Sequence, residues 1–243
     1  MKHNVLFPAS DPMGAAIFDY HRNGAPAGKL VVHSSMFEDD EIPVADLFRC
    51  YMDMPHIEQV ALQQAQGKIL DVGAGSGCHS IALKQMNKEA LAIDISPLSV
   101  QVMQERGLNA QLTDFYSKDF YEKFDTILML MNGTGIIGNM DGIPEFFARL
   151  KQLLTPSGSV IIDSSDLCYL FEEEDGSVMI DLAGDYYGQL DYQMEYKGIC
   201  GEPFDWLYLD FNTLSAYAED YGFKAELLAE GEHYDYLARL TLA

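Results

Sequence analysis

The chain has 243 residues, of which 48% are hydrophobic and 22% are charged, a composition that is ordinary for a globular protein with a substantial core. Its 38 acidic residues against 15 lysines and arginines give a net charge of −23, which repels phosphate backbones and disfavours DNA and RNA as partners. No signal-peptide core is found near the start and no apolar run approaches about 20 residues, so we expect a cytoplasmic protein without a membrane partner.

Residues 1–66 precede the first predicted core strand, and we expect them to form a helical cap or lid. Apolar residues recur at a helical spacing over residues 44–52. A second helix is predicted over residues 56–66, because Pro55 stands where proline is tolerated at a helix start. The alternative for both helices is that they merely cover an apolar edge of the sheet.

Residues 69–83 predict a buried strand, a glycine-rich turn and the start of a helix. Gly73, Gly75 and Gly77 let the backbone turn tightly and approach a ligand at points where any Cβ would clash. The first amides of the following helix then point at that ligand. A nicotinamide-binding Gly-x-Gly-x-x-Gly pattern is broken, because Cys78 stands at its third glycine position. The motif that does stand here is Asp-x-Gly-x-Gly-x-Gly, which begins at Asp71.

Strands and helices alternate after this loop, which favours a parallel sheet with helices on both faces. The expected strands cover residues 89–96, 109–114, 124–132 and 160–163, and the expected helices cover residues 98–106 and 144–153, with a turn at 155–158. The four cysteines have no metal-site spacing, so we expect no metal.

An insertion is expected over about residues 166–210, where the alternation stops. Two β-like segments, residues 189–197 and 206–210, predict that it contains a β-hairpin. The expected elements that follow are a helix capped by Asn212 and ended by Gly222, and two closing strands over residues 224–230 and 234–242.

The glycine loop and the pattern that follows it resemble the class I S-adenosylmethionine-dependent methyltransferases, over roughly residues 67–166. The resemblance implies an α/β fold with a doubly wound, mostly parallel seven-stranded sheet and an antiparallel C-terminal strand. It also implies a cofactor-binding domain over residues 67–243, with S-adenosylmethionine as the cofactor.

The same resemblance carries cofactor roles onto matching positions. Asp71 is expected near the methionine end of the cofactor, or else it only tethers the glycine loop. Asp94 is expected to accept hydrogen bonds from the ribose hydroxyls, and Asp114 to meet the adenine amino group unless it only forms a turn. The full set of expected cofactor-binding residues is Asp71, Gly73, Ala74, Gly75, Gly77, Asp94, Ile95, Asp114, Phe115, Met131 and Asn132.

The acceptor side carries fewer signals. Asn132 stands where the fourth motif of the family faces the transferring methyl. Residues 131–135 replace the Asn-Pro-Pro-Tyr signature of enzymes that methylate adenine or glutamine, which disfavours those two substrates. No general base is identified. The candidates for a catalytic role are His56, Asn132 and Asp166, each with capping or turn formation as the alternative, and the candidates for substrate contact are Phe48 and Tyr51.

The sequence therefore predicts an S-adenosylmethionine-dependent methyltransferase that acts on a small molecule, with catalysis mainly by positioning. Aminopropyl transfer on the same fold is one alternative, although no acidic polyamine-binding motif is found. A non-catalytic cofactor-binding protein is the other, and the intact Asp71, Asp94 and loop glycines weigh against it. The acceptor atom and the oligomeric state stay open.

Overall fold

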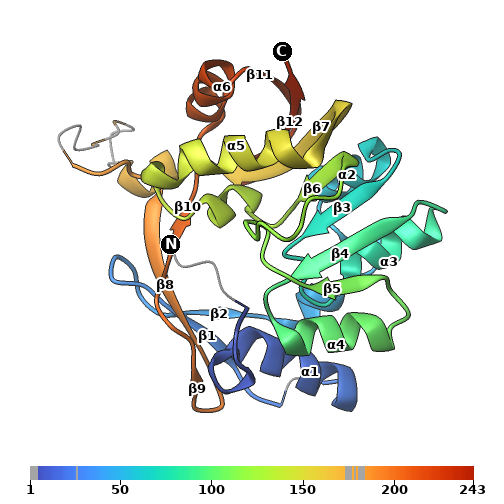
Figure 1. The fold of residues 1–243 in the computed structure, drawn as a ribbon. Helices are drawn as coiled ribbons and strands as arrows, with labels where there is room; N and C mark the ends of the chain where they lie inside the picture. The colour runs from blue at the N-terminus through green and yellow to red at the C-terminus, as the bar shows by residue number, and fades with distance from the viewer. Residues whose placement is uncertain (1–4, 26, 173–176, 178, 180–183) are drawn as a thin grey trace.

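The computed structural model describes residues 5–25, 27–172, 177, 179 and 184–243, and its centre is a seven-stranded sheet (Figure 1). The strand order is β11–β12–β7–β6–β3–β4–β5. Five strands run parallel, namely β3 (Ile69–Val72), β4 (Ala90–Asp94), β5 (Ala110–Leu112), β6 (Phe124–Met129) and β7 (Leu154–Ser165). The last two, β11 (Phe223–Glu230) and β12 (Asp235–Leu242), are antiparallel to their neighbours. This sheet confirms the predicted fold class.

Helices cover both faces of this sheet (Figure 1). One face carries α5 (Ile143–Leu153) and α6 (Phe211–Asp220), and the other carries α2 (His56–Gln64), α3 (Cys78–Gln85) and α4 (Pro97–Glu105). Side chains alternate between the two cores, so that in β6 Ile127 and Met129 belong to the α5 side while Leu128 belongs to the α2 side. A strand buried on both faces needs such a continuous apolar run.

A second, five-stranded sheet was not predicted. It consists of β1 (Leu30–His33), β2 (Asp40–Ile42), β8 (Gln189–Tyr196), β9 (Ile199–Cys200) and β10 (Phe204–Leu207). In Figure 1 the blue strands of the N-terminal segment lie beside the orange strands of the insertion, because β1 and β8 pair antiparallel with Leu30 opposite Tyr196. Helix α1 (Pro12–Asn23), also not predicted, packs on β8 and on α4.

The helix expected over residues 56–66 is present as α2, whereas α1, β1 and β2 were not expected within residues 1–66. The single helix over residues 44–52 is wrong. Two short 3₁₀ helices, η2 (Val44–Phe48) and η3 (Tyr51–Asp53), stand in its place, because the backbone at Arg49 and Cys50 is extended. Asp11 accepts a hydrogen bond from the backbone N of Gly14 at the start of α1, and Pro12 follows it. The pair Asp11–Pro12 is a typical sequence signal for the start of a helix.

Two further details differ from the prediction near the end of the chain. The turn expected at residues 155–158 lies within β7, as an irregularity between the pairs Phe124–Leu154 and Thr126–Ser159. Helix α6 is capped by Asp210, whose carboxylate accepts from the backbone N of Thr213 at 3.0 Å, rather than by Asn212. The predicted hairpin is present as β8 and β10, although residues 173–176, 178 and 180–183 of the insertion lie outside the described residues. Within the described part of the chain, no helix combines the length and apolarity needed to cross a bilayer.

Candidate functional site

The strand order marks one place on the sheet for a ligand. The chain passes from β3 outward to β4 and β5, and then returns to the other side of β3 with β6. In doubly wound sheets ligands bind at the carboxyl ends of the strands where the order reverses in this way. The glycine loop after β3 and the turn after β6 therefore flank the same crevice.

The glycine loop is left-handed at each of its three glycines, with φ values of +68° at Gly73, +55° at Gly75 and +81° at Gly77. Gly73 has no atom within 4 Å of the point where a Cβ would stand, so its backbone is open to a ligand. At Gly77 a Cβ would lie 2.4 Å from Leu108 Cδ1 and 2.9 Å from Met103 Cγ, so a larger residue would displace these two side chains. Ala74, which follows Gly73 in the loop, is buried.

Asp94 at the end of β4 closes the loop. Its Oδ2 accepts from the backbone N of Gly75 and its Oδ1 from the backbone N of Ser96, each at 2.8 Å. Burial raises the pKa of Asp94 to about 6. The hydrogen bonds from the two amides lower this pKa, whereas the charges of Asp11 and Asp71 raise it further. The next residue, Ile95, is 39% exposed. A carboxylate beside an open glycine backbone and an exposed apolar side chain fits a ribose with its attached base.

Asp71 lies behind the loop on β3, and its Oδ2 accepts from Ser80 Oγ at 2.7 Å. Burial raises the pKa of this carboxyl. The contact with α3 supports the tethering role, and a role at the methionine end of the cofactor stays a prediction.

Asp114 and Phe115 follow β5. Asp114 Oδ1 accepts from the backbone N of Tyr116 at 2.8 Å, which is a turn-forming contact. The Phe115 ring is buried in the main core beside Phe146. Contact of either residue with the adenine stays a prediction.

The turn after β6 is strained, because Met131 and Asn132 are consecutive left-handed residues that are not glycine, with φ values of +67° and +62°. Each such residue costs about 1–3 kcal/mol. The buried carboxylate of Asp163 on β7 accepts from the backbone N of Met131 at 3.0 Å and from the backbone N of Gly133 at 2.8 Å. Asp163 was not among the predicted site residues, although an acid at the carboxyl end of a predicted core strand was a signal for it.

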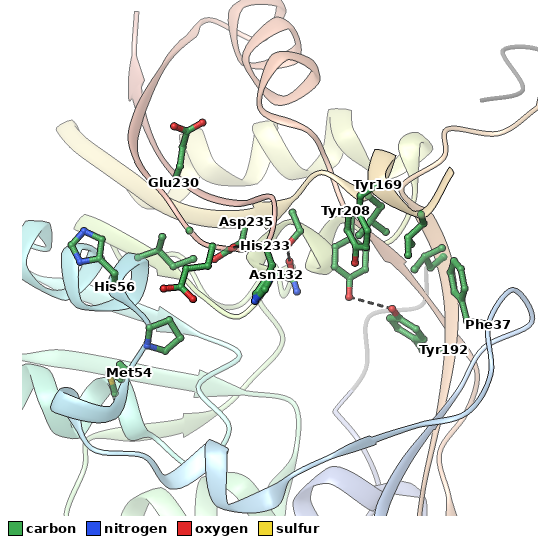
Figure 2. Close-up of a pocket in the computed structure, with 18 of the residues that line it drawn as sticks. Phe37, Met54, His56, Asn132, Tyr169, Tyr192, Tyr208, Glu230, His233 and Asp235 are labelled. Atoms are coloured by element: carbon green, nitrogen blue, oxygen red, sulfur yellow. Dashed lines mark hydrogen bonds between the residues drawn. The ribbon is translucent and has the colours of Figure 1, made fainter. Parts of the chain in front are cut away.

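A cavity of about 970 Å³ opens at this edge of the sheet. Figure 2 shows Asn132 between His56 from α2 on one side and two tyrosines, Tyr192 and Tyr208, on the other. The two tyrosine hydroxyls lie 3.2 Å apart. The cavity-lining residues are Phe37, Asp53, Met54, Pro55, His56, Ile57, Asn132, Ser165, Leu167, Tyr169, Leu170, Leu190, Tyr192, Tyr208, Glu230, Gly231, Glu232, His233 and Asp235.

Of the predicted acceptor-side residues, the structure brings His56 and Asn132 together at this cavity and leaves the others outside its lining. Phe48 stacks on Tyr20 with ring centroids 4.6 Å apart. The hydroxyl of Tyr51 accepts from Gln63 Nε2 at 2.7 Å.

Asp166 caps a 3₁₀ helix, η6 (Leu167–Phe171), by accepting from the backbone N of Cys168 at 2.9 Å. It also accepts from the Tyr187 hydroxyl at 2.7 Å. These contacts support its turn-forming role. Within the described ranges, no group of three or more histidine, cysteine, aspartate or glutamate side chains is arranged to hold a metal ion.

The N-terminal segment contacts the same edge of the sheet. Ser96 Oγ donates to Asp11 Oδ2 at 2.6 Å, and the backbone N of Leu6 donates to the carbonyl of Ile95 at 2.9 Å. Ser76, within the glycine loop, donates its hydroxyl to the carbonyl of Leu47. Residues before the first core strand therefore touch both the glycine loop and the end of β4.

A buried ion-pair network joins this segment to the helix after the glycine loop. Glu58 on α2 pairs with Arg49, and its Oε2 lies 2.9 Å from His79 Nε2 on α3. Burial opposes the charge on Glu58, but His79 and Arg49 together lower the pKa of this carboxyl. Burial also lowers the pKa of His79. Hydrogen bonds to Cys78 and Glu58 raise it by more, so the pKa of His79 lies well above its ordinary value.

Comparison with known proteins agrees with this geometry. Residues 69–158 match the family model described as a methyltransferase domain. Two curated proteins match more distantly, a cypemycin N-terminal methyltransferase of Streptomyces sp at 24% identity and the putative methyltransferase YqeM of Bacillus subtilis at 25%. Each match covers 40% of this chain and 42% of the relative, so the match spans less than half the length of these proteins.

Solved structures match over most or all of the chain. The methyltransferase CcbJ of Streptomyces caelestis, at 16% identity and a TM-score of 0.60 over 82% of this chain and 96% of its own, shares the fold. A methyltransferase of Bacteroides fragilis in complex with S-adenosyl-L-homocysteine superimposes with a TM-score of 0.94 and is 57% identical, covering 100% of this chain and 99% of its own. This chain is therefore a member of the S-adenosylmethionine-dependent methyltransferase family, with S-adenosylmethionine as its cofactor.

Proposed function

We propose that the enzyme transfers a methyl group to a small molecule held in the cavity beside Asn132. The observation that carries this proposal is the position of the cavity, which opens at the same edge of the sheet as the glycine loop and the turn after β6. S-adenosylmethionine supplies a methyl group already activated on a sulfonium. The protein's own part is to orient the acceptor and to exclude water around it.

Asn132 is the residue that we expect to orient the acceptor. Its Oδ1 accepts from Ser165 Oγ at 3.1 Å, which fixes the side-chain amide against β7. Among the described residues its Nδ2 has no hydrogen-bond partner, so its two hydrogens are available to a lone pair on the acceptor.

The charge of the cavity favours neutral or cationic acceptors. Four carboxylates line it and, in the part of the chain that the structure describes, neither lysine nor arginine does, so an anionic acceptor is repelled. Tyr169, Tyr192 and Tyr208 offer ring faces that attract a cation or stack on an aromatic group.

Replacement of Asn132 by alanine is expected to lower kcat by about 10- to 100-fold, as lost orientation of the acceptor implies. The measurement is release of S-adenosylhomocysteine with a panel of matched amines, phenols and carboxylic acids. Asn212→Ala, an exposed change on α6, serves as the control and is expected to keep wild-type activity. Turnover confined to the carboxylic acids, or an unchanged kcat in Asn132→Ala, would contradict the proposal.

The N-terminal segment is proposed to close over the cofactor as a lid, which its contacts with Ile95, Ser96 and Ser76 support. Lys29 lies in this segment with its side chain 73% exposed, so trypsin can report its opening. If opening requires release of the cofactor, S-adenosylhomocysteine at 100 times its Kd slows cleavage there by about 100-fold. If cleavage at Lys29 keeps its rate while the core becomes protected, the segment is not a lid.

A further inference from the structure

The last residues of β7 hold the turn that carries Asn132. β6 and β7 are parallel neighbours with Met129 opposite Ile162, so the turn that leaves β6 runs beside the end of β7. Three consecutive side chains there contact the turn, and they do so at different points. Asp163 accepts from the backbone N of Met131 and of Gly133, the Ser164 hydroxyl lies 2.7 Å from that of Thr134, and Ser165 donates to Asn132 Oδ1.

Asp163 is the residue of β7 that holds the backbone of the turn at two points. Its side chain is 5% exposed, and its two oxygens bond the amides on either side of Asn132. The turn packs closely on both strands at Gly133, where a Cβ would lie 2.7 Å from Met129 Cβ on β6 and 3.1 Å from Ile162 Cγ1 on β7. Without the carboxylate, two backbone amides in a strained turn would lose their acceptor.

We propose that Asp163 is a positioning residue, whose carboxylate holds the strained turn by two backbone amides and so fixes the Asn132 amide in the wall of the cavity. Its effect on the acceptor rests on the proposed function, whereas its effect on the turn does not. Asp163 itself does not line the cavity.

Asp163→Asn is the informative change, because it keeps the shape of the side chain but replaces one acceptor oxygen with an NH₂ donor. One of the two backbone amides then meets a donor instead of an acceptor. Asp125→Asn is the matched control. Asp125, near the opposite end of β6, also accepts from a backbone amide, that of Lys68, and from a hydroxyl, that of Thr155, each at 2.9 Å.

Amide hydrogen exchange and cofactor affinity are measured first, because neither needs the acceptor. With S-adenosylhomocysteine bound, we expect exchange at Met131 and Gly133 to accelerate at least 10-fold in Asp163→Asn and to stay unchanged in Asp125→Asn. The Kd for S-adenosylhomocysteine is expected to stay within about threefold of the wild-type value, because Asp94 and the glycine loop are intact. Unchanged exchange in Asp163→Asn would overturn the proposal.

A titration of the wild-type protein by NMR tests the same contact without any variant. Burial raises the pKa of Asp163 to about 6, so the amide protons of Met131 and Gly133 are expected to shift together with a midpoint near pH 6. The other titratable groups facing Asp163 are Glu58 on α2, whose pKa is lowered, and Tyr208 and Tyr236, whose pKa values are raised. None of these three titrates near pH 6. Separate midpoints for the two amides would show that they do not share one carboxylate, and would overturn the contact.

Activity separates positioning from a merely structural role. With an acceptor from the panel above, Asp163→Asn is expected to lower kcat at least 10-fold while the KM for S-adenosylmethionine changes less than threefold. A kcat equal to that of Asp125→Asn would overturn the positioning role. If the wild-type enzyme methylates nothing in the panel, the proposed function falls, while exchange and titration still decide whether Asp163 holds the turn.

Discussion

Replacement of Glu58 by glutamine is expected to lower the free energy of unfolding by about 3 kcal/mol, because it leaves Arg49 and a charged His79 without their shared buried partner. For a chain of this size that corresponds to a fall in Tm of roughly 6–12 °C. The loss is measured by urea denaturation at constant pH. Glu122→Gln removes an exposed partner of Lys68 and is expected to leave stability almost unchanged.

The stability difference between wild type and Glu58→Gln is expected to depend on pH in a defined window. The lowered pKa of Glu58 makes its contribution present above 4.5, its ordinary value, and lost as the pH falls through the folded value. The raised pKa of His79 makes its contribution full below 6.5 and lost as the pH rises through the folded value. The difference is therefore largest between pH 4.5 and 6.5. A loss no greater than that of Glu122→Gln in this window would show that the network does not stabilise the fold.

The same network limits which part of the proposed lid can open. Arg49 and Glu58 belong to the segment before the first core strand, whereas His79 is in the first turn of α3, directly after the glycine loop. Because the three side chains share one buried carboxylate, movement of α2 away from α3 would leave charges unpaired. The part of the lid near α2 is therefore expected to stay in place, and opening to be confined to residues before Val44.

The sequence predicted those parts of the site that depend on neighbours in the chain. The glycine loop and Asp94 could be predicted because the turn requires left-handed glycines and the ligand requires an acid at the end of a strand, and both are visible in a short stretch of sequence. Asp163 is different, because its partners at Met131 and Gly133 lie 32 and 30 residues away. Only the register of β6 against β7 brings Asp163 close to Met131 and Gly133, and that register cannot be predicted from the sequence of either strand alone.

The second sheet was missed for a similar reason. β1 pairs with β8, so residues near position 30 lie beside residues near position 196. No local sequence pattern predicts which distant strand will pair with β1. Phe48 illustrates the related limit of periodicity. Its spacing predicted a helix that is not formed, and the ring packs on Tyr20 and beneath Arg106 instead of lining the cavity. Periodicity shows that a side chain is covered, whereas the identity of the covering residue follows from tertiary structure.

Replacement of Asp94 by alanine is expected to weaken the binding of S-adenosylhomocysteine by about 1.5–3 kcal/mol, the range for lost hydrogen bonds to a charged group. The corresponding increase in Kd, measured by calorimetry, is roughly 10- to 100-fold. Part of this loss comes from the loop, since the amide of Gly75 loses its acceptor as well. S-adenosylhomocysteine is also expected to raise the Tm of the wild-type protein, whereas NAD and NADP are not.

The pH dependence of this affinity identifies Asp94 as its source. Because the pKa of Asp94 in the free protein is raised to about 6, the carboxylate that accepts hydrogen bonds is lost to protonation as the pH falls below that value. Affinity for S-adenosylhomocysteine is therefore expected to fall between pH 7 and about pH 5, by up to tenfold per pH unit below the pKa. Asp94→Asn, which cannot titrate, should bind weakly and equally at both pH values, whereas Asp125→Asn should retain the wild-type profile. If Asp94→Asn keeps the wild-type pH dependence, Asp94 is not the residue that holds the ribose. If NAD raises the Tm as much as S-adenosylhomocysteine does, the assignment of the glycine loop to S-adenosylmethionine loses its basis.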